Sequence, residues 1–238
     1  MSRLDRDLAR RALAEGLGTC LLVVAVIGSG IAAQRLTPDD VGLELLENTI
    51  ATGAALVALI LAFGSVSGAH FNPVVTLADR VLGGITTTAA AAYVAVQVVG
   101  ACLGAVLANL MFDLDPVTLS THTRSSGGLW LGEVIATFGL LLVILGVVRS
   151  GRPSLAPFAV AGWITAAYWC TSSTSFANPA VTLARTLSDT FAGIRPSSAP
   201  AFVLAQLGGA ALAVVVARFL HPTVDAHDVV VPHDSERA

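Results

Sequence analysis

A short phrase that occurs twice constrains this 238-residue chain more than any other feature. It reads FNPVVTLA at residues 71–78 and FANPAVTLA at residues 176–184. An Asn followed by Pro fits the start of a helix, because Asn caps the first turn and Pro tolerates the first position, which needs no N–H partner. Inside a membrane, the N–H groups at two such starts are tolerated only where they face a water-filled path. The repeated phrase therefore predicts a pore.

The composition is that of a membrane protein. Hydrophobic residues make up 55% of the chain, charged residues 12%, and the mean hydropathy is +0.78. An average soluble domain carries about 25% charged residues. Apolar runs, each close to the ~20 residues that cross a bilayer, occupy about 12–33, 48–66, 89–112, 128–148, 155–172 and 199–220. We expect an all-α membrane protein with six transmembrane helices and two half-helices after Asn72 and Asn178.

The two halves of the chain repeat each other. Glu133 echoes Glu15 and Asn178 echoes Asn72, and both pairs occur in the same order. Three spans per half is an odd number, so the second half enters the membrane from the opposite face and the repeat is inverted. Segments 72–81 and 178–187 would each form a half-helix ~15 Å long, and two placed tip to tip would cover the ~30 Å core.

These patterns divide the chain into three parts. We expect a cytoplasmic N-terminus at 1–10, a channel domain at 11–220 and a disordered cytoplasmic tail at 221–238. The halves of the channel domain are 11–112 and 128–220. Arginine counts give the orientation. With the N-terminus in the cytoplasm, nine arginines fall inside and four outside, the four being Arg35, Arg124, Arg185 and Arg195. Both termini are therefore expected in the cytoplasm.

Glu15 and Glu133 lie in the middle of apolar runs, where an unpaired charge is costly. One interpretation is a proton-coupled secondary transporter of a small solute, in which both carboxyl groups carry protons. The other is structural: each carboxyl group accepts hydrogen bonds and anchors the nearby re-entrant loop. The presence of one Glu in each repeat favours the anchor. Gln97 and its echo Gln206 are expected to act with them as polar links between helices.

Several classes of function have no support in the sequence. The chain has no nucleotide-binding loop, no nucleophile elbow and no HExxH motif, so we expect no enzyme activity, no cofactor and no metal. No basic groove indicates a nucleic-acid partner. The expected partners are the lipid bilayer, water and small neutral solutes.

Residues 67–76, SGAHFNPVVT, resemble the first signature of the aquaporin and glycerol-facilitator family, and Asn178-Pro179-Ala180 resembles the second. With the paired Glu and Gln residues, the resemblance covers about 11–220. It implies a homotetramer in the cell membrane in which each protomer conducts water and small uncharged solutes passively. In such a pore the amides of Asn72 and Asn178 would donate to the passing oxygen. The half-helix N-termini, each equivalent to about +0.5 charge, would repel protons.

Two positions depart from the family pattern. Val74 follows Asn72-Pro73 where Ala is usual, and Val181 stands where most members have an Arg in the outer constriction. The other constriction positions implied by the resemblance are Thr52, Ser175 and a fifth-helix residue, which is Tyr168 or, as the alternative, Ala166. Without the Arg, and with Thr52 in place of an aromatic ring, we expect a wide filter. It would pass glycerol-like polyols or neutral metalloid acids such as arsenite, with water as a secondary substrate.

His70 and Arg185 are candidates for a vestibule or a gate. His70 directly precedes the first repeated phrase and would line the cytoplasmic vestibule or bond the loop backbone. Arg185 lies one helical turn beyond Val181 on about the same face. It would either replace part of the missing charge at the outer vestibule or face loops or lipid headgroups.

Overall fold

The computed structural model describes residues 3–221, and every regular element in that range is a helix. The expected tail at 221–238 lies outside the described residues except for His221. Six longer helices are α1 (Arg3–Leu36), α2 (Val41–Ser67), α4 (Thr87–Met111), α5 (Gly127–Arg149), α6 (Ala156–Cys170) and α8 (Ala199–Leu220). Two short helices are α3 (Pro73–Leu82) and α7 (Pro179–Ala184), and 3₁₀ turns occupy Pro153–Leu155, Arg185–Leu187 and Pro196–Ser198.

The six longer helices coincide with the six apolar runs, which confirms the predicted fold class. Five of the described helices are long and apolar enough to cross a membrane by length and composition. The sixth, α6, has only 15 residues, or ~22 Å at 1.5 Å per residue. Its predicted run began at residue 155, but Pro153–Leu155 form a 3₁₀ turn. The run also extended to residue 172, whereas the helix ends at Cys170.

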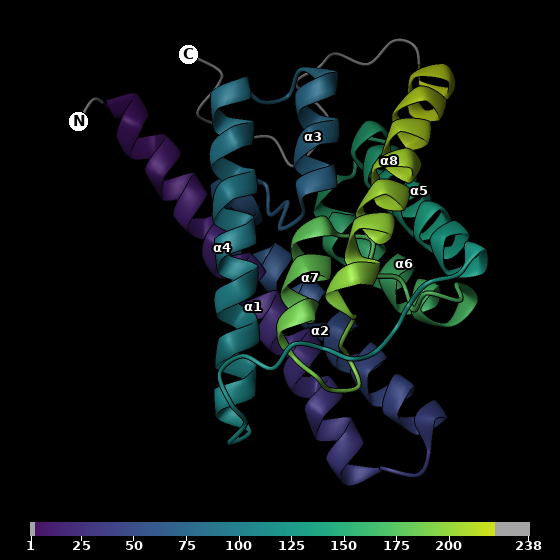
Figure 1. The fold of residues 1–238 in the computed structure, drawn as a ribbon. Coiled ribbons are helices and arrows are strands. Elements are labelled where there is room, and N and C mark those ends of the chain that lie inside the picture. Colours follow the sequence, from purple (N-terminus) through teal and green to yellow (C-terminus); the bar gives the residue numbers. More distant parts are fainter. Residues whose placement is uncertain (1–2, 222–238) are drawn as a thin grey trace.

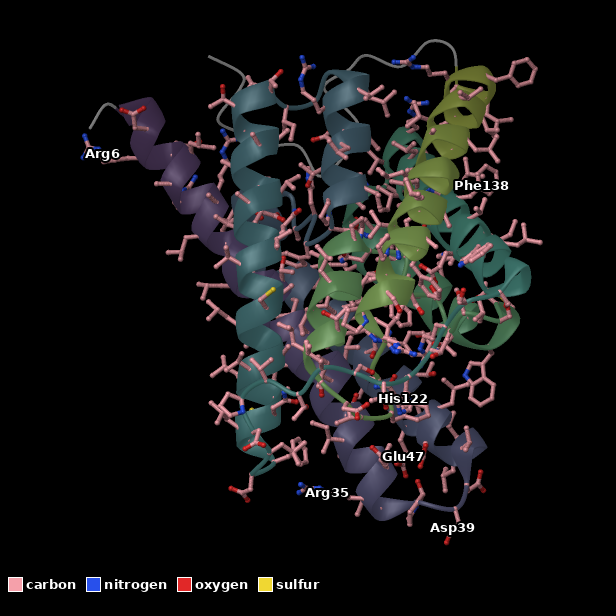
Figure 2. The ribbon with its side chains drawn as sticks, in the orientation of Figure 1. Arg6, Arg35, Asp39, Glu47, His122 and Phe138 are labelled. Atoms are coloured by element: carbon pink, nitrogen blue, oxygen red, sulfur yellow. The ribbon has the colours of Figure 1, made fainter. Side chains whose placement is uncertain are left out.

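The two halves have matching arrangements in space. Helix α1 packs against α4 and α2, and α5 packs in the same way against α8 and α6. The half-helix α3 lies above α7 in Figure 1, with α3 toward the top of the bundle and α7 near its middle. The start of α1 and the end of α8 lie at the same end of the bundle (Figure 1). Figure 2 shows Arg6 at that end and Arg35 and Asp39 at the opposite end.

Glycines bring the paired long helices into close contact. A side chain on Gly100 of α4 would collide with the backbone carbonyl of Gly16 in α1. In the second half, a side chain on Gly209 of α8 would collide with the carbonyl of Val134 in α5. Small residues that permit such backbone contact are typical of membrane helix pairs. The same crossing is therefore built twice, once in each half.

Both half-helices begin as the sequence predicts. Asn72 and Asn178 are the N-caps, and a Pro occupies the first turn of each helix. Helix α3 has the expected ten residues. The prediction was wrong for the second half-helix, because α7 has only six α-helical residues and continues as a 3₁₀ turn at Arg185–Leu187. The carbonyls of Thr186 and Leu187 accept hydrogen bonds from the backbone of Ser120 and Thr118, which ties this end to the α4–α5 loop.

The close crossing of α5 and α8 predicts different effects for two neighbouring glycines. Gly209→Ala should lower the stability by about 1–3 kcal/mol, because the new methyl group overpacks the contact with Val134. Gly208→Ala is the matched control, since nothing lies within 4 Å of a Cβ at that position. Thermal unfolding of detergent-purified protein, followed by size exclusion, measures both. Equal midpoints for the two variants would contradict the packing argument.

Candidate pore and selectivity filter

The loops before the two Asn residues share an unusual backbone. Ala69 and Phe71 have φ values of +50° and +49°, and Ser175 and Ala177 repeat them at +50° and +48°. The left-handed region costs a non-glycine residue about 1–2 kcal/mol. Ser175 follows Ala69 by 106 positions, and Ala177 follows Phe71 by the same number, which is also the spacing of the two Asn residues. Both loops are therefore held in one conformation by the surrounding structure.

Glu15 supplies that support in the first half. Its side chain is fully buried and accepts hydrogen bonds at both oxygens. Oε1 accepts from Ser67 Oγ at 2.6 Å and from the His70 backbone N–H at 2.9 Å. Oε2 accepts from the Phe71 backbone N–H at 2.7 Å and from Gln97 Nε2 at 2.8 Å. Backbone N–H groups that helix geometry leaves without partners are satisfied in this way.

Glu133 has the equivalent position in the second half. Its buried carboxyl group accepts from the backbone N–H groups of Phe176 and Ala177 at 2.8 and 2.9 Å. Gln206 Nε2 donates to the same carboxyl group at 2.6 Å and to Thr182 Oγ1 at 2.8 Å. In every hydrogen bond to Glu133 the carboxyl group is the acceptor, which is the arrangement expected of a loop anchor.

The two Asn side chains join the halves at the centre of the molecule. Asn72 Nδ2 donates to the Ala177 carbonyl and Asn178 Nδ2 donates to the Phe71 carbonyl, both at 2.7 Å. Each Asn Oδ1 also accepts a backbone N–H from the first turn of its own half-helix. Because an amide nitrogen carries two N–H bonds, each Asn keeps one donor that this crosswise pair of hydrogen bonds does not use.

One cavity is lined by both Asn72 and Asn178. Its polar side is formed by the two re-entrant loops, including His70, Asn72, Ser175 and Asn178. The opposite walls are apolar and come from α1, α2, α5 and α6 through Leu22, Val26, Leu56, Ile60, Leu140, Ile144, Val148, Val160 and Ile164. Glu15 and Glu133 are not among the lining residues. The arrangement offers hydrogen-bonding groups along one side of a mostly apolar passage.

The four predicted filter positions all line this cavity: Thr52, Tyr168, Ser175 and Val181. Thr52 Oγ1 lies 3.2 Å from the Tyr168 hydroxyl. Ser175 Oγ is buried and has no hydrogen-bond partner among the described residues. The alternative fifth-helix residue, Ala166, is exposed and does not line the cavity. Three hydroxyl groups and one aliphatic side chain therefore surround this part of the passage.

His70 and Arg185 also line the cavity. His70 Nδ1 lies 3.0 Å from Thr76 Oγ1, and Nε2 lies 3.4 Å from Asp79 Oδ2. Arg185 is 2% exposed and its Nε donates to the Ala192 carbonyl, so the side chain faces the α7–α8 loop rather than lipid headgroups. Its guanidinium lies over the Phe176 ring, 3.4 Å from the ring centroid.

The sequence reasoning missed several residues of the site. Ser67 donates to Glu15, and Thr76 and Thr182 accept hydrogen bonds from Gln97 and Gln206 respectively. A signal for the threonines was present, because both belong to the repeated phrase. Phe176 also belongs to that phrase, whereas Arg124 had no such signal. Arg124 comes from the α4–α5 loop and reaches Phe176 only through the fold, with its Cζ 5.3 Å from the ring centroid.

The anchor geometry predicts that Glu133→Gln destabilises the protein. The new amide would direct N–H groups at donors that need an acceptor, and a buried polar group without a partner costs about 1–3 kcal/mol. Thr137→Val is the matched control one turn away, because Thr137 Oγ1 is buried and has no partner among the described residues. The midpoint of thermal unfolding in detergent should fall for Glu133→Gln alone. A similar fall in both variants would contradict the anchor.

The comparisons with known proteins agree with this geometry. A family model described as major intrinsic protein matches residues 4–167. The chain is 53% identical to "Aquaglyceroporin AqpS" of Rhizobium meliloti, over 90% of this chain and 91% of that protein. It is 30% identical to "Aquaporin AqpM" of Methanothermobacter marburgensis, over 90% and 98%.

A solved structure has the same fold. The X-ray structure of the aquaglyceroporin from Plasmodium falciparum superposes with a TM-score of 0.66 at 23% identity, covering 91% of this chain and 96% of that one. Family match, relatives and fold all agree. The chain belongs to the major intrinsic protein family, which consists of membrane channels and not of enzymes.

Proposed function

We propose that the protein is a passive channel for small uncharged solutes, namely glycerol-like polyols and neutral metalloid acids such as arsenite, and for water. The observation that carries the proposal is the cavity that passes both Asn caps. The unused N–H of each Asn replaces a hydrogen bond that a hydroxylated solute loses on leaving water. The apolar opposite wall accepts the carbon side of a polyol.

The filter supports a solute wider than water. Val181 offers no donor, and Thr52, Tyr168 and Ser175 contribute hydroxyl groups that both donate and accept. A polyol and a neutral trihydroxy metalloid acid present the same kind of surface, several hydroxyl groups on a compact centre. The name of one relative, "Aquaglyceroporin AqpS", supports the glycerol part of this proposal.

Protons are excluded, in this proposal, at the centre of the passage. Both half-helices begin there, and helix N-termini carry partial positive charge. The two Asn amides add donors at the same level. An excess proton would meet donors and positive potential where it needs acceptors.

Proton-coupled transport is the less favoured alternative. It would need Glu15 and Glu133 to exchange protons with the passage. Both side chains are fully buried and outside the cavity lining, and their oxygens are occupied by loop donors. A carboxyl group that holds the loop in place cannot cycle through protonation without releasing the loop.

The proposed setting is the cell membrane, with both termini in the cytoplasm. The start of α1 and the end of α8 share one end of the bundle, and Arg6 marks that end (Figures 1 and 2). In this orientation α7 and Arg185 face the outside. Large apolar side chains are exposed along the helices, among them Leu17, Leu103, Leu131, Leu204 and Val215. They fit a homotetramer surrounded by lipid, each protomer with its own pore.

Liposomes that contain the purified protein should shrink and reswell in a glycerol gradient faster than empty liposomes, when followed by light scattering. The glycerol flux should rise linearly with concentration and should not respond to an imposed pH gradient, because no step is coupled to protons. Arsenite and urea gradients extend the test to other neutral solutes. Flux no greater than in empty liposomes would contradict the channel, and flux driven by the pH gradient would favour the transporter.

Val181→Arg should narrow the filter. The longer side chain occupies space that Val181 leaves open to the cavity, so glycerol flux should fall at least several-fold more than water flux. Val181→Ala, which keeps the space and adds no donor, is the control and should preserve the ratio of glycerol to water. An equal loss of both fluxes in Val181→Arg would indicate a blocked or misfolded pore, and unchanged fluxes would place the filter elsewhere.

A further inference from the structure

Arg185 is a buried cation at a position that differs from the one where most family members have their filter Arg. It lies one turn after Val181, at the start of the 3₁₀ turn that follows α7. Its side chain is 2% exposed in total and lines the cavity together with Tyr168 and Ser175. The family pattern places its Arg at position 181, so here the cation is displaced outward along the same half-helix.

The guanidinium is fixed but largely unpaired. Nε donates to the Ala192 carbonyl, and the group stacks on Phe176. Among the described residues, the N–H groups of its two terminal nitrogens have no hydrogen-bond partner, and no carboxylate forms an ion pair with Arg185. A buried guanidinium in this state is costly unless water or solute satisfies it. The adjoining cavity is the place where such a partner can lie.

The α7–α8 loop prevents the side chain from moving away. The backbone N–H of Ile194 donates to the Arg185 carbonyl. The backbone N–H of Gly193 donates to the Thr190 carbonyl and so forms a turn. Arg124 Nε donates to the Gly193 carbonyl at 2.9 Å. Arg124 also lies near the Phe176 ring, so a second cation approaches the same ring. The charge of Arg185 is therefore held in place at the mouth of the filter.

We propose that Arg185 is the specificity-determining cation of this channel. It repels small cations through its fixed charge, which is weakly screened in a low-dielectric passage. Its free N–H groups bind the oxygens of an entering hydroxylated solute, because a guanidinium presents paired donors in one plane. Val181 then widens the passage without removing the positive charge. This inference rests on the proposed channel function and assigns the exclusion of cations in that function to Arg185.

The variants for the test are Arg185→Gln and Arg185→Met, which remove the charge, and Arg185→Lys, which keeps it. Arg195→Gln is the matched control, because Arg195 is exposed in the same loop. Each protein is reconstituted in liposomes that enclose a pH-sensitive dye. The dye reports methylammonium entry and proton leak under a potassium diffusion potential, and light scattering reports glycerol flux.

In Arg185→Gln and Arg185→Met we expect methylammonium and proton conductance at least tenfold above wild type. Arg185→Lys should keep both conductances at the wild-type level but lower the glycerol flux several-fold, because it loses the planar pair of donors. Arg195→Gln should match wild type in every measurement. Either charge-removing variant that folds is sufficient for the test.

Wild-type cation and proton conductance in a folded Arg185→Gln or Arg185→Met would overturn the proposal. An equal leak in Arg195→Gln would also overturn it, since the effect would then come from the loop in general. Failure of the wild-type protein to conduct glycerol would contradict the proposed channel function, and this result is distinct from a failure of the Arg185 proposal. The cation measurements would still show whether Arg185 closes the passage to charge.

Discussion

Two buried carboxyl groups hold the re-entrant loops on which this architecture depends. Each half of the chain breaks a helix inside the bundle and leaves backbone N–H groups where neither water nor a helix can satisfy them. Glu15 and Glu133 accept those groups and hold the left-handed turns that precede Asn72 and Asn178. The half-helix starts, the crosswise Asn bonds and the course of the cavity all follow from loops fixed in this way.

The halves repeat in structure and differ after the second half-helix. Anchors, glutamine links, helix crossings and loop dihedrals recur in both. Helix α3 runs for ten residues, whereas α7 gives way to a 3₁₀ turn after six. Residues 185–195 then return beside the passage and bring Arg185 and Phe176 together. The repeat builds the two re-entrant loops, and its departure from symmetry accompanies a buried Arg185 that lines the cavity.

The sequence predicted those features that depend on local signals. Apolar runs gave the long helices, and the Asn-Pro pairs gave both half-helix starts, because capping depends on two or three adjacent residues. The end of α7 could not be predicted, since it depends on hydrogen bonds from Thr118 and Ser120. The place of Arg185 depends on Phe176 and on the Ala192 carbonyl, and helical spacing alone left its direction open. The short α6 reflects a 3₁₀ start that hydropathy does not report.

The crosswise Asn bonds also bear on how the molecule is made. Asn72 finds its acceptor 105 residues later in the chain, at Ala177, and Phe71 receives its donor from a residue 107 positions on. The hydrogen bond that Asn72 donates therefore cannot form before Ala177 has been added to the chain. The middle of the pore can close only when the second half has been inserted. Assembly of the conducting centre is thus a late step that neither half completes alone.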